Sequence, residues 1–176
     1  MRLMTSTALV ALIAGTAAAQ PVRFFAEDFD SLPLKDSVDE GVVATGVWTD
    51  VPPAGWTTTF SLPGTGVTEW RGFNFADVDW WALTGGDQRR SEFSALNGGA
   101  GIGTVAIADG DEWDDIGSNP DDQYDTTLVS PAVVIPATAD RGTLELRFSS
   151  SWRPESIQKA DVEVSYDGGS TWDLIK

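Results

Sequence analysis

Two stretches in the last third of the chain alternate strictly between apolar and polar side chains, and this period of two constrains the fold more than any other feature. Every second side chain is apolar in residues 144–149 (LELRFS) and again in residues 161–166 (DVEVSY). Neighbouring side chains of a β-strand point to opposite faces, so each stretch predicts a strand with one buried face and one wet face. Because the glycines of residues 167–170 (DGGS) favour a tight turn, residues 161–175 are predicted to form a β-hairpin.

Three further stretches are typical of strands. Residues 55–60 (GWTTTF) are rich in aromatic and β-branched side chains, which suit a pleated surface. Residues 103–108 (GTVAIA) form the short apolar run expected of a buried strand, and residues 22–29 are a candidate first strand. Helical periodicity is hard to find after residue 20, while glycine and proline punctuate the chain throughout. We therefore expect one all-β domain over residues 20–176, built as a β-sandwich.

Several motifs resemble those of a known group of sandwich domains. Residues 25–30 (FAEDFD), followed by residues 53–57 (PAGWT), resemble the opening of bacterial cleaved-adhesin-type and MAM-like jelly-roll domains. Residues 125–132 (DTTLVSPA) and 144–148 (LELRF) are similar to two of their core strands, and residues 162–172 (VEVSYDGGSTW) to their hairpin. The resemblance implies a jelly-roll (concanavalin/MAM-like) β-sandwich with an accessory role, in adhesion, in carbohydrate binding or beside an enzyme.

The resemblance also implies an incomplete domain. The closing strands of those domains carry a W-x-(I/V)-D-(N/D) signature that is missing here, so the chain is expected to be C-terminally truncated, a fragment of a longer protein. Residues 108–115 (ADGDEWDD) and 151–155 (SWRPE) are similar to the N-terminal region of some secreted bacterial metallophosphoesterases. The phosphatase of those proteins is a separate, histidine-rich domain. This similarity therefore concerns a parent protein and not an activity of these residues.

Residues 1–19 are expected to be a signal peptide that is cleaved before Gln20. Arg2 gives the positive start, residues 8–14 (ALVALIA) the apolar centre, and residues 17–19 (AAA) the small side chains that cleavage needs. The apolar run is too short to span a bilayer core of about 30 Å, and no other run of spanning length follows. The protein is therefore predicted to be secreted, extracellular or periplasmic, with no transmembrane segment.

Charge and composition exclude several kinds of function. The chain has 27 Asp and Glu against 11 Lys and Arg, a net charge of -16, so nucleic acid is not an expected partner. It contains neither His nor Cys, which excludes disulfides, Ser-His-Asp and Cys-His nucleophiles, and zinc sites built from imidazole or thiolate. A glycosidase needs only two carboxylates, but nothing marks any two of these as a pair.

The densest negative charge lies in residues 109–125, which hold eight acidic side chains and no basic one. Ca²⁺ prefers roughly six to eight oxygen ligands, and closely spaced aspartates beside glycine can supply them. Domains of the resembled type often hold a structural Ca²⁺ near their first strand, which implies further ligands there. The predicted site combines both regions through Asp28, Asp30, Asp109, Asp111 and Asp114. The alternative, at even weight, is that residues 109–125 form a solvated acidic loop.

Aromatic side chains give the second candidate site. The faces of indole rings suit the C–H groups of sugars, and Trp80, Trp81 and Trp113 are the candidate ligand-binding residues. The alternative is packing in the core, which is the commoner role of tryptophan. On a strand, Trp80 and Trp81 would point to opposite faces, so at most one would face the core. Trp56 and Trp172 match positions that are core in the resembled domains.

Together these features predict a non-catalytic, exported recognition module that binds carbohydrate or another surface ligand and uses structural Ca²⁺. The alternative is a structural accessory domain of a secreted hydrolase, such as a metallophosphoesterase, without a ligand of its own. The expected partners are an extracellular glycan or surface ligand and, in a longer parent chain, an adjacent catalytic or anchoring domain.

Overall fold

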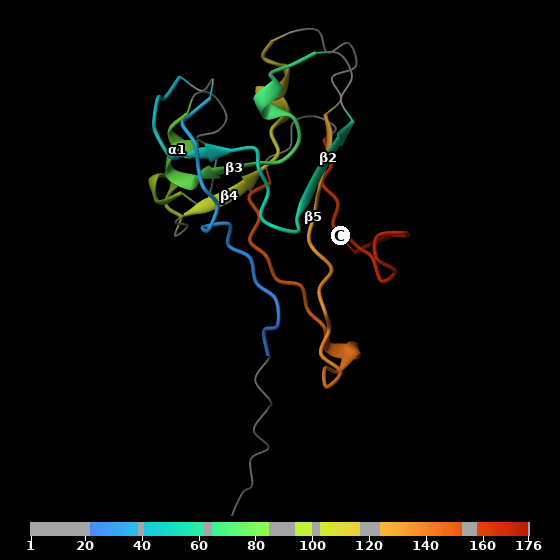
Figure 1. Cartoon of the computed structure of the whole chain (residues 1–176). Helices are drawn as coiled ribbons and strands as arrows, with labels where there is room; N and C mark the ends of the chain where they lie inside the picture. Colours follow the sequence, from blue (N-terminus) through green and yellow to red (C-terminus); the bar gives the residue numbers. More distant parts are fainter. Residues whose placement is uncertain are drawn as a thin grey trace, which may run out of the picture.

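Small antiparallel sheets and a few short helices make up the protein (Figure 1). The structure is a computed structural model, and it describes residues 22–38, 41–61, 65–84, 94–99, 103–116, 124–152 and 158–175. The predicted signal peptide lies outside these residues. The mostly β character is confirmed, but the sheets of the described residues form neither a closed barrel nor a clear sandwich.

The largest sheet has the strand order β1-β3-β4. β1 (Trp48–Thr49) pairs with β3 (Asn74–Asp77), which pairs on its other side with β4 (Thr104–Ile107), and both pairings are antiparallel. β4 lies within the apolar run of residues 103–108, so the strand predicted there is confirmed. The first three residues of β3 are all buried, and the strand therefore lacks the alternation by which sequence reveals a half-buried strand.

The helix α1 (Val78–Leu83) follows β3 directly and contains both adjacent tryptophans. Asp77 is its N-cap, because its carboxylate accepts hydrogen bonds from the backbone N–H of Asp79 (3.1 Å) and Trp80 (2.8 Å). Trp80 and Trp81 are both buried, which a helix allows and a strand facing one core does not. The mostly β expectation holds, but an all-β domain does not account for this helix. With six residues, α1 is too short to show helical periodicity in the sequence.

Other short helical segments connect the strands. α2 (Gly110–Asp114) and the 3₁₀ segment η1 (Thr68–Trp70) pack against each other. Two more 3₁₀ segments are η3 (Ala95–Asn97) and η4 (Arg141–Thr143). These short segments lie between strands in the chain order.

The core gathers around α1 and the β1-β3-β4 sheet. Four of its buried members are tryptophans. The buried members are Trp48, Val67, Trp70, Ala76, Trp80, Trp81 and Ile107. The ring of Trp70 lies 6.1 Å from that of Trp48 and 5.1 Å from that of Trp81, with the planes inclined. Inclined aromatic pairs are favoured because the positive edge of one ring meets the negative face of another. These inclined indole pairs thus supply much of the packing that this short-stranded sheet needs.

Two smaller sheets complete the fold. β2 (Thr57–Ser61) pairs antiparallel with β5 (Asp125–Val129), in a register that sets the first residue of β2 opposite the last of β5. β6 (Glu163–Val164) and β7 (Asp173–Leu174) form the hairpin that the sequence predicted, although each strand is only two residues long. All four strands lie where strands were predicted.

Two predicted strands are not paired. Residues 22–28 join no sheet of the described residues, and Phe29 then leaves the extended conformation with a φ of +64°. Residues 144–150 follow η4, lie outside the sheets and are exposed along their whole length (Figure 1). Their alternation is real in the sequence, but no neighbouring strand covers the apolar side chains. These missing pairings are why a sandwich does not form in the described part of the chain.

Candidate functional site

The first two predicted calcium ligands lie in a tight turn at residues 27–30. The Glu27 carboxylate accepts hydrogen bonds from the backbone N–H of Asp28 (3.1 Å) and Phe29 (2.8 Å). Asp28 Oδ1 accepts one from the backbone N–H of Asp30 (3.1 Å). Aspartate and glutamate commonly bond their own backbone in this way, and it stabilises the turn. Carboxylate oxygens of this turn are thus engaged by its own backbone.

Asp30 ties this turn to the largest sheet. Its Oδ1 accepts a hydrogen bond of 2.7 Å from the backbone N–H of Thr104, the first residue of β4. Gly103 precedes that residue with a φ of +85°, and a Cβ there would overlap the Asp30 carboxylate. The left-handed conformation of Phe29 costs roughly 1–2 kcal/mol, and its ring packs 5.5 Å from that of Trp56. Ring packing and the carboxylate clamp together hold the strained turn.

The other three predicted ligands belong to α2. Asp109 is the N-cap, since its Oδ1 accepts a hydrogen bond of 3.0 Å from the backbone N–H of Asp111. Asp111 and Asp114 are exposed on the helix. Burial, and secondly the negative charge of Asp109, raise the pKa of Tyr124 far above its ordinary value. Tyr124 therefore stays protonated and donates a hydrogen bond of 2.6 Å to the carbonyl of Gly72.

The structure does not assemble these five carboxylates into one site. Over the described residues, no three or more Asp or Glu side chains are grouped so as to hold a metal ion. Asp28, Asp30 and Asp109 instead accept hydrogen bonds from backbone N–H groups. Calcium binding therefore stays a prediction that rests on charge density and on the resemblance.

The three tryptophans predicted to bind ligand are core residues. Trp80, Trp81 and Trp113 are between 3% and 6% exposed. The indole N–H of Trp80 donates a hydrogen bond of 2.9 Å to the carbonyl of Val42, and Gly66 lies so close to Trp113 that no side chain would fit between them. Their ring faces are covered by protein, which corresponds to the packing alternative weighed from the sequence. A platform for sugar has to be sought among other aromatic residues.

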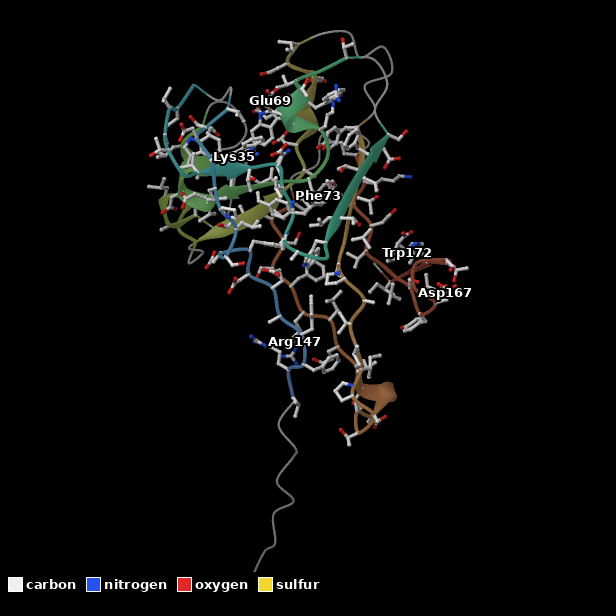
Figure 2. The ribbon with its side chains drawn as sticks, viewed as in Figure 1. Lys35, Glu69, Phe73, Arg147, Asp167 and Trp172 are labelled. Atoms are coloured by element: carbon white, nitrogen blue, oxygen red, sulfur yellow. The ribbon has the colours of Figure 1, made fainter. Side chains whose placement is uncertain are left out.

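The β6–β7 hairpin carries two aromatic side chains that are open to solvent. Tyr166 is 77% exposed and Trp172 is 43% exposed, although Trp172 was expected to be core. Figure 2 shows Trp172 and Asp167 together on this hairpin, which projects at the right of the view. Trp172 lies beside Gly169, where an added Cβ would come within 3.7 Å of the ring. The only sequence cue to this arrangement was the alternation itself, and it does not say which face is covered.

Asp167 makes the turn of this hairpin rigid. Its carboxylate accepts hydrogen bonds from the backbone N–H of Ser170 (3.0 Å) and Thr171 (2.9 Å) and from the hydroxyls of Thr171 (2.8 Å) and Ser165 (2.9 Å). The backbone N–H of Thr171, followed by its hydroxyl and that of Ser165, lowers the pKa of Asp167 to about 2. Gly168 and Gly169 take the positive φ angles that the turn requires. The exposed rings thus stand on an ordered turn.

An open depression of about 390 Å³ is another surface feature that could take a ligand. It is lined by Asp36, Ser37, Gly41, Val42, Val43, Ala44 and Thr45. The hydroxyl of Ser37 accepts a hydrogen bond from the backbone N–H of Ala44 (3.0 Å), and no aromatic ring lines the hollow. The hairpin therefore offers the better platform for a flat apolar ligand face.

None of the helices in the described ranges has the length and apolar character needed to cross a bilayer. The function therefore has to be argued from the residues of this chain, because no family model, curated protein or solved structure matches it.

Proposed function

We propose that this chain is an exported, non-catalytic recognition module of the jelly-roll sandwich type, and that it binds an extracellular glycan through its β6–β7 hairpin. The observation that carries the proposal is the pair of exposed rings, Tyr166 and Trp172, on a turn that Asp167 holds rigid. Tyrosine and tryptophan are enriched at binding surfaces because each ring joins an apolar face to a polar tip.

The chemistry of the hairpin suits a sugar. An indole face attracts the polarised C–H groups of a pyranose ring, and a phenol adds a hydroxyl that both donates and accepts hydrogen bonds. Glu163 and Asp173 on the strands, together with Asp161 just before β6, supply further acceptors for sugar hydroxyls. Because the turn is already ordered, binding would cost little conformational entropy, and preorganisation of this kind favours affinity.

A non-catalytic role is supported by how the chain uses its acidic side chains. Asp30, Asp77, Asp109 and Asp167 all accept hydrogen bonds from backbone N–H groups. Without His and Cys, acid–base chemistry would fall chiefly to carboxylates, and these four serve the fold. The exported location is the one that the N-terminal sequence predicts, in the extracellular space or the periplasm.

The second candidate is a structural accessory domain of a secreted hydrolase, such as a metallophosphoesterase. The observation in its favour is a set of exposed aliphatic side chains, including Val43 and Val134. Such side chains suit contact with another protein domain better than contact with a sugar. This candidate predicts no glycan binding by the isolated chain.

Binding of the purified chain to an array of extracellular polysaccharides tests the proposal. Trp172→Ala should weaken binding by roughly fivefold or more, since stacking on one aromatic ring is worth roughly 1–3 kcal/mol where it is known for nucleobases. Phe60→Ala is the matched control, because Phe60 is a similarly exposed aromatic residue on β2. Circular dichroism of both variants should match that of the wild type. Absence of binding to every glycan, or equal losses in the two variants, would favour the accessory-domain candidate.

A further inference from the structure

Residues 144–150 are a segment with strand-like alternation that joins no sheet of the described residues. Leu146 is 62% exposed and Phe148 is 55% exposed, although both belong to the apolar face of the alternating pattern. In the described part of the chain, the backbone N–H and C=O groups of residues 145–150 make no hydrogen bond. An edge of unpaired N–H and C=O groups, with apolar side chains at every second position, is a template for another strand. A second strand satisfies both the donors and the acceptors of that edge.

We propose that a second copy of this chain supplies that strand, by antiparallel pairing of residues 144–148 about a twofold axis at Leu146. In this register Leu146 lies opposite its own counterpart, and Leu144 lies opposite Phe148 of the other copy. Glu145 lies opposite Arg147 of the other copy, twice, on the reverse face. The sequence LELRF is therefore complementary to itself: apolar side chains meet on one face and opposite charges on the other.

The charges of Glu145 and Arg147 are the observation that favours a second copy of this chain over another partner. Directly opposite residues of unlike charge stabilise a strand pair, whereas like charges destabilise it. Figure 2 shows Arg147 on the extended segment, outside the sheets. Within one chain its Nε donates to Glu145 at 2.7 Å, and both side chains are well exposed, so they are available for partners across the axis.

The overall charge does not oppose the pairing locally. Each chain carries a net charge of -16, but residues 142–150 contain one acidic and one basic side chain and are neutral. Repulsion between the two chains acts over longer distances, and physiological salt screens it beyond about 8 Å. The proposal is independent of the glycan site, because none of these residues belongs to the β6–β7 hairpin.

Charge reversal tests the pairing through oligomeric state. Light scattering and sedimentation equilibrium of the purified chain should show that a dimer forms as the concentration is raised to about 100 µM. Glu145→Arg and Arg147→Glu should each weaken the dimer by roughly tenfold or more, because each sets like charges opposite one another twice. A mixture of the two variants should dimerise again, since every opposite pair is then unlike. The double variant E145R/R147E should dimerise as the wild type does.

A cysteine at the axis tests the register. The chain has no cysteine, so Leu146→Cys introduces a single thiol, and oxidation should cross-link it to its counterpart. Val134→Cys is the control, an exposed apolar position outside the pairing segment that should cross-link slowly. Circular dichroism should confirm that the variants keep the wild-type fold. A monomeric wild type, a dimer that both charge reversals leave intact, or equal cross-linking at the two cysteines would each overturn the proposal.

Discussion

At the scale of single residues, aspartate is the side chain that organises this protein. The sequence marks Asp167-Gly168-Gly169-Ser170 as a turn, and the turn is present with both glycines at positive φ. It could not show that the Asp167 carboxylate would accept bonds from residues three and four positions ahead, because that depends on the finished turn. The same holds for Asp30, whose partner Thr104 lies 74 positions away.

Asp167 gives a prediction for pH. Its pKa is lowered to about 2 in the folded state, below the ordinary value of 3.8, so the ionised form stabilises the turn. That stabilisation is complete above about pH 4 and is lost as the pH falls from 4 towards 2. The carboxyl chemical shift of Asp167 in a titration followed by NMR should have its midpoint near pH 2, and the amide signals of Ser170 and Thr171 should move with it. A midpoint near pH 4 would contradict the hydrogen-bonded turn.

At the scale of elements, prediction succeeded where the pattern was local. β2, β4 and the β6–β7 hairpin lie where alternation, β-branched residues and glycine placed them, and β5 lies where the resemblance implied a strand. β3 was missed because all but its last residue is buried, and α1 because six residues cannot display a helical period. The segment at residues 144–148 shows the opposite case: its alternation is clear, but pairing depends on a neighbour that local sequence does not specify.

The N-cap of α1 gives a prediction at this scale. Asp77→Ala removes the acceptor for the N–H groups of Asp79 and Trp80 and should lower the free energy of unfolding by about 1 kcal/mol in urea titrations. Asp77→Asn keeps an acceptor and should lose much less. Asp111→Ala, an exposed aspartate on α2, is the control and should change stability by less than about 0.5 kcal/mol. Equal losses in D77A and D77N would show that the cap contributes nothing.

At the scale of the whole molecule, the sequence pattern predicted the class of fold but not how the sheets are arranged. Alternation and turn residues indicated β structure, and the small sheets agree. The site was less accessible to prediction. Trp80, Trp81 and Trp113 looked like platforms because sequence does not reveal which ring faces are covered, and the tertiary packing covers all three. Trp172 was expected in the core because it matches a core position of the resembled domains, and it is exposed.

Calcium binding is a prediction at this scale, because its ligands would come from separate segments. If the site exists, the melting temperature of the chain should be higher with Ca²⁺ than with chelator, and Mg²⁺ should not substitute for it. A Ca²⁺ concentration a hundredfold above its Kd would add about 2.7 kcal/mol to the free energy of unfolding. Identical cooperative melting with Ca²⁺ and with chelator would show that the acidic side chains of α2 and the turn at residues 27–30 bind no Ca²⁺ tightly.

The clamp between Asp30 and Thr104 also orders events in time. A ribosome makes residue 30 long before residue 104, so the turn at Phe29 has no partner to hold its strained conformation while the intervening chain is being synthesised. The amino-terminal segment therefore docks only after β4 has emerged, and closing so long a loop delays that contact further. Until then the segment that follows the predicted cleavage point stays accessible to whatever machinery handles the nascent chain.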